Sequence, residues 1–537
     1  MRIVIDCQCL QTDSRYRGIG HYTTALMRQM LIENKEKNNS QNEFIFILNN
    51  IDISVVNKIK NDFSDLLDNV KIYTINILLD CIDTEKKISI GRLYNELMYH
   101  NFISNLNADF VFILSLFEGR DEPLVNYIVN SKIRNYQIGV IGYDLIPLIS
   151  SDKYLADKRV YNWYHNKLDN LRKADIIFTI SNSAKSEFDT YLDNYNGKTI
   201  NISSACDAAY FCFDESKKKI NYFDIEFIKK IGINKPFIMY SGAADERKNL
   251  RSLIQAYSLL NNDIKNKFDI VLVGNYHQSS KQELTNYAKS LNINEQQIKY
   301  TGFISLEELN TLYNYCSVFV FPSLHEGFGL PVLEAMTCGA AVICSNTTSL
   351  PEVIDNEVAT FNPLNVNEIA NLLNKVLTDD NFKNKLIQHN LKKCKEFSWK
   401  KSANIVISEI EKLVSENKNI KDNKTINDDF YKHIAEIAVE HKASDKLLRQ
   451  LANCIAANEV SINNQNKAKI NFPTYHWRIE GPFDSSYSLA LLNRETARAL
   501  SIIGQQVDLH STEGPGDFIP NGNFLKNNPD ILALYNN

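Results

Sequence analysis

Short apolar runs alternating with amphipathic helical stretches constrain the fold of this chain most strongly. The runs are rich in Val, Ile and Phe and show little apolar–polar alternation, which is typical of strands buried on both faces. The predicted strands are Arg2–Asp6, Phe44–Leu48, Phe110–Leu114, Gln137–Gly142, Ile176–Ile180, Pro236–Ser241, Phe268–Val273, Ile298–Thr301, Val318–Pro322 and Ala341–Cys344. Helical patterns lie between them, among them Tyr22–Ile32, Leu250–Leu260, Leu306–Tyr315 and Val332–Cys338. This alternation predicts α/β domains with parallel sheets and helices on both faces.

A polar, Lys-rich stretch around Ser216–Asn221 separates the strands into two series. Each series predicts one doubly wound, Rossmann-like domain, over residues 1–212 and 213–400. Two such domains face a cleft, which is the natural ligand site. Residues 401–416 continue a helical pattern that starts at Ser398, and residues 417–468 are predicted to be a linker containing a helix.

Residues 469–537 repeat the order of elements found at the start of the chain. A strand at 469–475, a loop at Gly481 and Pro482, a helix at Ser488–Ile503 and a strand at Gln506–His510 are predicted. Roughly 70 residues hold too few strands to bury a sheet on both faces, so this is a partial third α/β segment. We therefore expect residues 1 to about 415 to suffice for activity and the last segment to add no second active site.

Composition excludes several classes of protein. Hydrophobic residues make up 44% and charged residues 23%, which argues against a disordered chain, and a net charge of −5 argues against bulk nucleic-acid binding. No apolar run reaches the roughly 18 residues that span a bilayer, and the N-terminus lacks signal-peptide features. The ten cysteines form no CxxC pair, which predicts reduced thiols in the cytoplasm, with Cys7 and Cys9 on one face of a strand.

Residues 317–353 form the most informative segment, predicted as strand, glycine-rich loop, helix and strand. Gly327 and Gly329 allow close backbone approach to a ligand, and the helix N-terminus that follows favours anions. Glu334 could accept hydrogen bonds from a ribose diol and Glu326 from a hexose. The alternative is that Glu334 only complements the helix dipole and that Glu326 is a solvated loop acid.

Three further loops hold candidate residues. Arg247 and Lys248 stand where a loop meets a helix that Asn249 could cap, and two cations there suit a diphosphate, unless they are an ordinary exposed pair. Gly18 and Gly20 open a helix, but they lie too far from the preceding strand for a dinucleotide fingerprint. Tyr143 and Asp144 end a strand where parallel sheets bind ligands, although Asp144 could equally be a satisfied strand-end carboxylate.

Together these segments resemble the retaining glycosyltransferases of family 4, which have the two-domain GT-B fold. The resemblance covers residues 1 to about 415, with the helix after Trp399 crossing back onto the first domain. It implies that Asp144, Arg247, Lys248 and Glu326 are catalytic. It also implies a donor-binding set of Gly18, Gly20, Arg247, Lys248, Glu326, Gly327, Phe328, Gly329, Leu330 and Glu334. Many members carry His where this chain has Tyr143, which is a departure from the pattern.

The resemblance implies transfer of a hexose from a nucleotide sugar to a sugar hydroxyl, without cofactor or metal. Residues 115–123 look like members from bacterial O-antigen and surface-polysaccharide clusters, and residues 477–495 look like the opening of a second glycosyltransferase module in multi-domain members. We therefore expect GDP-mannose as donor, a lipid-linked glycan as acceptor, contacts with polysaccharide assembly proteins and peripheral contact with the cytoplasmic membrane. Two alternatives stay open: a nucleotide-sugar epimerase on the same fold, and a silent nucleotide-sugar-binding subunit of an assembly complex.

Overall fold

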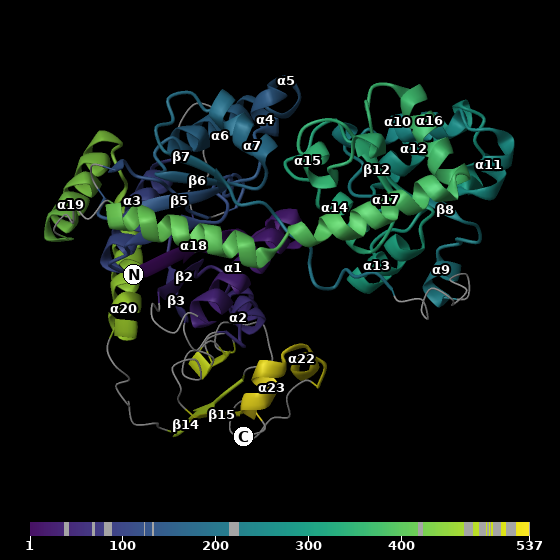
Figure 1. The fold of residues 1–537 in the computed structure, drawn as a ribbon. Helices are drawn as coiled ribbons and strands as arrows, with labels where there is room; N and C mark the ends of the chain where they lie inside the picture. Colours follow the sequence, from purple (N-terminus) through teal and green to yellow (C-terminus); the bar gives the residue numbers. More distant parts are fainter. Residues whose placement is uncertain are drawn as a thin grey trace. The chain divides into compact units, whose positions relative to one another are not determined.

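The first domain is built on a seven-stranded parallel sheet in the order β3-β2-β1-β4-β5-β6-β7 (Figure 1). This computed structural model describes residues 1–36, 42–66, 70–79, 89–122, 124–131, 134–213, 225–416, 423–466, 476–482, 490, 493–494, 496–497, 506–511 and 522–535. The strands are β1 (Arg2–Asp6), β2 (Glu43–Asn49), β3 (Val70–Ile75), β4 (Phe110–Ile113), β5 (Gln137–Gly142), β6 (Ile176–Thr179) and β7 (Lys198–Asn201). The helices are α1 (Gly18–Glu36), α2 (Ile53–Asp62), α3 (Ile90–Asn105), α4 (Ile146–Ile149), α5 (Ser151–Tyr154), α6 (Lys158–Leu171) and α7 (Asn182–Tyr191).

The second domain is built on a six-stranded sheet in the order β10-β9-β8-β11-β12-β13. Its strands are β8 (Phe237–Ser241), β9 (Asp269–Val273), β10 (Ile298–Tyr300), β11 (Val318–Phe321), β12 (Val342–Ser345) and β13 (Thr360–Phe361). Its helices are α9 (Glu226–Lys230), α10 (Leu250–Ser258), α11 (Asn262–Lys267), α12 (Gln278–Ser290), α13 (Leu306–Tyr315), α14 (Leu330–Thr337), α15 (Leu350–Ile354), α16 (Val366–Thr378) and α17 (Asp380–Lys393). The prediction of two doubly wound parallel-sheet domains is confirmed.

The two sheets reverse their strand order at β1/β4 and at β8/β11. Ligands of open α/β sheets bind beyond the carboxyl ends of the strands at such switch points. The loops that leave β8 and β11 hold Arg247, Lys248 and Glu326, and the loop that leaves β5 holds Asp144. The topology therefore gathers the predicted site residues at strand ends.

The strands that sequence analysis missed are β3, β7 and β13. Each lies at an outer edge of its sheet. The residues of β3 and β7 are mostly only partly buried, and β13 has only two residues. An edge strand needs no continuous apolar run, so these segments lack the pattern that identified the central strands.

Helix α18 (Trp399–Glu416) leaves the second domain and packs along α1 of the first domain (Figure 1). Its buried residues Ala403, Val406, Ile407, Ile410 and Leu413 recur at helical spacing, so one apolar stripe faces α1. Polar contacts flank the stripe. The amide of Asn404 donates to Glu33 over 3.1 Å, and the amide of Asn42 donates to Glu411 over 3.2 Å.

The stretch predicted as linker is mostly helical. Helices α19 (Asn423–Glu440) and α20 (Asp445–Asn466) are separated by a short break in which Lys442 has φ +51°. Phe430 and Leu451 are buried in one apolar cluster with Leu78, Tyr94 and Met98 of the first domain. The prediction missed this role because a polar segment with sparse apolar residues looks like a linker when its partner surface is unknown.

The chain divides into two compact units, Met1–Ile462 and Asn463–Asn537. In the second unit, β14 (His476–Glu480) pairs in parallel with β15 (Gln506–His510), as strands joined by a crossover do. Helices α22 (Gly522–Asn527) and α23 (Pro529–Tyr535) follow. The predicted strand at 469–475 lies outside the described residues, as does most of the helix predicted at Ser488–Ile503.

Cys7 and Cys9 do not share a strand, contrary to the prediction. Strand β1 ends at Asp6, and Cys9 lies in a 3-10 helix over Gln8–Gln11. Both cysteines are buried, and the cysteines of the described residues are free thiols.

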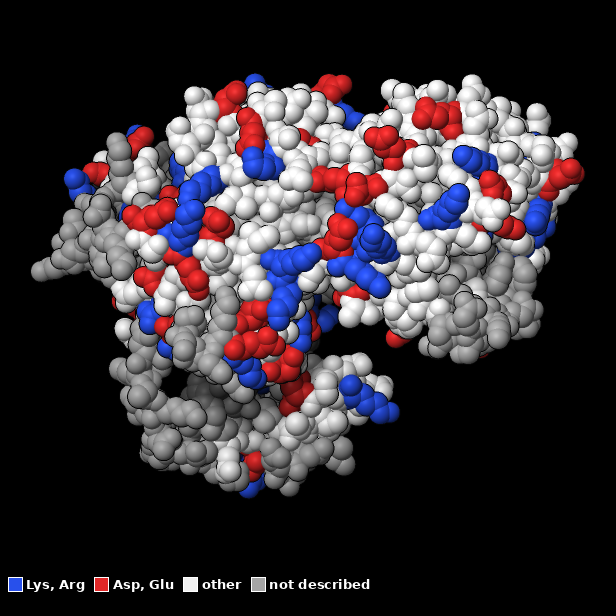
Figure 2. Space-filling view, in the orientation of Figure 1, with Lys and Arg blue, Asp and Glu red and all other residues white. Residues whose placement is uncertain are grey.

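Charges of both signs are interspersed on the face shown in Figure 2, as a chain of small net charge leads one to expect. None of the described helices combines the length and the hydropathy needed to cross a membrane.

Candidate active site

Arg247 and Lys248 are presented by a tight 3-10 turn (Glu246–Lys248) in the loop after β8. The carboxylate of Asp245 accepts a hydrogen bond from the backbone N–H of Arg247 over 2.9 Å and fixes the start of this turn. Asn249 adopts a left-handed conformation with φ +58°, and its side chain donates to the carbonyls of Pro322 and Pro363. The prediction that Asn249 caps α10 is therefore wrong, because its amide joins the loop to two other loops instead.

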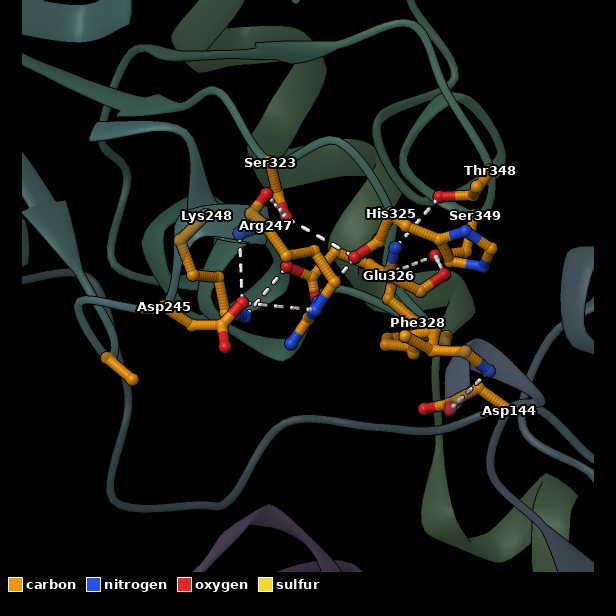
Figure 3. Close-up of polar contacts among 12 residues, drawn as sticks. Asp144, Asp245, Arg247, Lys248, Ser323, His325, Glu326, Phe328, Thr348 and Ser349 are labelled. Carbon is orange, nitrogen blue, oxygen red and sulfur yellow. Dashed lines mark hydrogen bonds and ion pairs between the residues drawn. The ribbon is translucent and has the colours of Figure 1, made fainter. Parts of the chain in front are cut away.

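Both cations meet the carboxylate of Glu326 (Figure 3). The Lys248 ammonium lies 2.7 Å from Oε1 of Glu326, and the Arg247 guanidinium lies 3.2 Å from Oε2. Their side chains are only 14% and 21% exposed, so neither alternative holds: the cations are not an ordinary surface pair, and Glu326 is not a solvated loop acid. Burial raises the pKa of Glu326, but the charges of Lys248 and Arg247 outweigh it and hold the pKa below its usual value.

Two side-chain hydroxyls hold the backbone of the loop that carries Glu326 (Figure 3). The Glu326 N–H donates to the Thr348 hydroxyl over 3.0 Å, and the Ser349 hydroxyl donates to the carbonyls of Glu326 and Phe328. The loop ends at Gly329, whose φ of +102° is a conformation that glycine adopts without strain, and α14 begins at Leu330. A loop fixed in this way can hold a charged group in place before a ligand arrives.

Asp144 reaches this loop from the first domain. One of its carboxylate oxygens accepts a hydrogen bond from the Ile146 N–H over 3.1 Å, so the satisfied strand-end interpretation is correct for that oxygen. The other oxygen, Oδ2, faces Gly327: a Cβ atom added there would lie 3.2 Å from it. Burial raises the pKa of Asp144, and nearby Glu187 adds to the rise.

Gly327 sets how closely the two domains approach each other. An added Cβ would lie only 2.6 Å from the Tyr143 carbonyl oxygen, a backbone atom that cannot move alone. Gly327→Ala is therefore expected to separate the loop from Asp144 and to lower turnover by about 10–100-fold, because small misplacements of reacting groups are costly. Steady-state kinetics checks this against Gly522→Ala, whose added Cβ meets no atom within 4 Å. Unchanged turnover in Gly327→Ala would contradict it.

Glu334 lies in a second hydrogen-bonded group, with Tyr313 and Ser241. The Tyr313 hydroxyl donates to Oε2 of Glu334 over 2.9 Å and lies 2.6 Å from the hydroxyl of Ser241, the last residue of β8. Burial raises the pKa of Glu334 to about 7. This carboxyl is thus hydrogen-bonded to a buried tyrosine, a contact that a role limited to the helix dipole would not require.

Gly18 and Gly20 lie in the first turn of α1. A Cβ on Gly20 would lie 2.3 Å from the carbonyl oxygen of Arg15, so this position requires glycine, whereas Gly18 is exposed and has open space around it. Within the part of the chain that the structure describes, neither makes a hydrogen bond to the Glu326 group. The Tyr143 hydroxyl donates to the Leu114 carbonyl over 3.0 Å, so it is occupied within the first domain.

The structure thus brings together Asp144, Arg247, Lys248, Glu326 and Gly327. Sequence analysis missed two residues beside them, His325 and Glu187, whose side chains lie 2.6 Å apart across the domain boundary. No signal in a single sequence pairs residues that are 138 positions apart.

The comparisons with known proteins found similarity to glycosyltransferases. Residues 223–393, which contain Arg247, Lys248, Glu326 and Glu334, match the family described as "Glycosyl transferases group 1". The serotype-specific mannosyltransferase WbdA of Escherichia coli is 33% identical over 421 residues, which are 77% of this chain and 48% of that protein. The O-antigen chain mannosyltransferase B of Escherichia coli is 29% identical and is covered over 65% of its length. The chain spans about half the length of WbdA.

Solved structures with the same fold include a sucrose-phosphate synthase and a protein solved in complex with UDP and glucose. Sucrose-phosphate synthase from Thermosynechococcus elongatus has a TM-score of 0.54 at 17% identity, and covers 78% of this chain and 100% of its own. HepE of Anabaena, solved in complex with UDP and glucose, has a TM-score of 0.53 at 16% identity over 77% of this chain and 100% of its own. At these identities the likeness shows the fold alone.

Proposed function

Because the chain has the GT-B fold and contains a domain of the glycosyl transferases group 1 family, we propose that it transfers a hexose from a nucleotide sugar to a sugar hydroxyl of a growing surface polysaccharide. The observation that carries this proposal is the largely buried group of Arg247, Lys248 and Glu326, which lies within the matched region. Gly327, the next residue of its loop, lies against Asp144. Mannose, with GDP-mannose as its donor, is the proposed sugar because WbdA and the O-antigen chain enzyme are named as mannosyltransferases.

The chemical demand of such a transfer is the charge that develops on the departing diphosphate. Two cations held in advance by a carboxylate can meet that charge without reorganising, and they act more strongly in a buried site than in water. We propose that Arg247 and Lys248 bind the diphosphate, that Glu326 orients them and the donor sugar, and that Asp144 orients the sugar from the first domain. The leaving phosphate would take the proton of the acceptor hydroxyl, and the anomeric configuration would be retained.

The donor-binding role extends to Gly18, Gly20, Phe328, Gly329 and Leu330, whose backbone would line the site, and to Glu334, which would hold the ribose. The acceptor is proposed to be a lipid-linked glycan, with polysaccharide assembly proteins as partners and the cytoplasmic face of the membrane as the place of action. We expect no metal requirement, so EDTA should leave turnover unchanged.

The test supplies radiolabelled GDP-mannose and other nucleotide sugars together with a lipid-linked oligosaccharide acceptor. Label is expected in the glycan, and Glu326→Ala is expected to remove it. Conversion of the donor without acceptor would instead support the epimerase. Donor binding without any turnover would support the silent subunit of an assembly complex.

Nucleotide affinity is expected to depend on pH through Glu334. Its pKa of about 7 means that the carboxylate form, which accepts hydrogen bonds from a ribose diol, predominates only above neutral pH. Affinity for GDP should therefore fall by up to about tenfold from pH 8 to pH 6, since a shift of one pKa unit corresponds to about a tenfold change in equilibrium. Calorimetric titration checks this, and Glu334→Gln should flatten the profile. The same slope in Glu334→Gln would assign it to another group.

A further inference from the structure

The N-terminal end of helix α7, in the first domain, lies against the loop that carries Glu326. Its N-cap residue, Ser181, accepts a hydrogen bond from the Ala184 N–H and donates one to the Gly327 carbonyl over 2.6 Å. The carboxylate of Glu352, in α15 of the second domain, accepts hydrogen bonds from the N–H groups of Asn182 and Ser183. The free N–H groups in the first turn of α7 thus find hydrogen-bond acceptors in the other domain. These bonds fix the helix relative to the loop that carries Glu326.

One turn further along α7, Glu187 makes a contact of a different kind. Its Oε1 lies 2.6 Å from Nε2 of His325, the residue directly before Glu326. Its Oε2 accepts a hydrogen bond from the N–H of Leu145, the residue directly after Asp144, over 2.9 Å. A single buried carboxylate therefore joins the neighbours of two candidate catalytic residues, one in each domain.

His325 is also tied to the diphosphate-binding turn. The Arg247 guanidinium donates to its backbone carbonyl, and the Ser323 hydroxyl lies 3.3 Å from the same oxygen. Figure 3 shows His325 beside Glu326 and Ser349. The contacts with Arg247 and Ser323 hold the backbone of His325 and not its imidazole, so removing the imidazole leaves the contact with Arg247 in place.

We propose that Glu187 and His325 form a positioning pair, which holds Asp144 of the first domain at its working distance from Glu326 and Arg247 of the second. This inference rests on the proposed function. This pair is expected to contribute to turnover rather than to nucleotide binding. When the contact between Glu187 and His325 is broken, Arg247 and Lys248 still keep their ion pairs with Glu326. Both residues of the pair also act on the pKa of Asp144. Burial is the largest cause of its raised pKa, Glu187 raises the pKa further, and His325 lowers it.

The test compares His325→Ala, His325→Gln and Glu187→Ala. The side-chain amide of glutamine can place a donor where Nε2 stands, so His325→Gln conserves the contact with Glu187. We expect His325→Ala and Glu187→Ala to lower kcat by about 10–100-fold with less than a twofold change in Kd for GDP and UDP, and His325→Gln to restore kcat to within about threefold. The control is Lys153→Ala, which removes an exposed ion pair to Glu246 between the same domains and should change kcat less than twofold.

Hydrogen exchange of the Leu145 amide gives a readout that needs no donor sugar. It should be faster in His325→Ala than in wild type and normal in His325→Gln, because the carboxylate that accepts this N–H loses its second anchor. If the wild-type protein transfers no sugar, the proposed function is wrong. Hydrogen exchange of the Leu145 amide would still show whether Glu187 and His325 hold the loop that contains Asp144. Unchanged exchange, unchanged kcat in both alanine variants, or a loss confined to nucleotide Kd would overturn the proposal.

Discussion

Replacing Arg247 with alanine is expected to lower hexose transfer by about 10²–10³-fold, the effect of removing one preorganised group that stabilises developing charge. The guanidinium is one of two cations on the Glu326 carboxylate, and it also holds the His325 carbonyl. Lysine should not restore full activity, because its ammonium is a compact point charge without the planar fork of N–H donors with which a guanidinium binds phosphate. Initial rates with saturating acceptor measure the loss.

The same substitution should leave folding almost intact. Glu326 keeps its 2.7 Å ion pair with Lys248, so no buried carboxylate is left without a partner. Arg251 offers a matched control, since it lies in α10 with a 60% exposed side chain and an ion pair of 3.9 Å to Glu283. Arg251→Ala should retain wild-type activity. Wild-type transfer in Arg247→Ala would contradict the assignment of a diphosphate site.

Ending the chain at residue 420 is expected to destabilise the first domain, although the predicted catalytic elements are all retained. The cut removes Phe430 and Leu451 from their cluster with Leu78, Tyr94 and Met98, and each such buried side chain contributes about 1.5–3 kcal/mol. The cut also uncovers the edge strand β3. In the full chain the side-chain amide of Asn458, in α20, exchanges two hydrogen bonds with the backbone of Asn76, the residue after this strand. The sequence alone predicts that residues 1 to about 415 suffice, and the packing of α19 and α20 moves the expected boundary to about residue 466.

Thermal unfolding and size-exclusion chromatography of chains ending at 420 and 466 check this expectation. The shorter chain should unfold about 5 °C or more below the longer one and should aggregate, since exposed apolar patches and open strand edges promote association. The chain ending at 466 should match the full chain. Equal unfolding temperatures for the two would show that α19 and α20 contribute nothing to the first domain.

The central part of the fold could be predicted because its strands are continuous apolar runs. β1 and β5 have the predicted bounds, and β8 and β11 differ by one residue at one end. The outer strand β7, with its sequence KTIN, could not be found because an edge strand does not require burial on both faces. Local pattern therefore identifies interior strands, and tertiary packing decides the outer ones.

The candidate site could be predicted in pieces and not as a whole. Each of Arg247, Glu326 and Asp144 stands in a local pattern with a chemical meaning, and the structure brings these loops together. The sequence could not show which distant groups these side chains bond. The Tyr143 hydroxyl donates a hydrogen bond to the Leu114 carbonyl, and the Asn249 amide bonds two other loops and does not cap its helix. Such roles depend on groups that are distant along the chain.

The packing of α18 on α1 has a consequence for how the protein is made. Asn42 and Glu411, which hydrogen-bond beside this contact, are 369 residues apart. A ribosome that adds about 5–20 residues per second needs about 20–70 s to cover that span. Throughout that interval α1 has emerged while α18 has not been synthesised, so the apolar face of α1 stays uncovered on the nascent chain. The first domain is thus the first to be translated and among the last to be completed, and chaperones have their longest access to it.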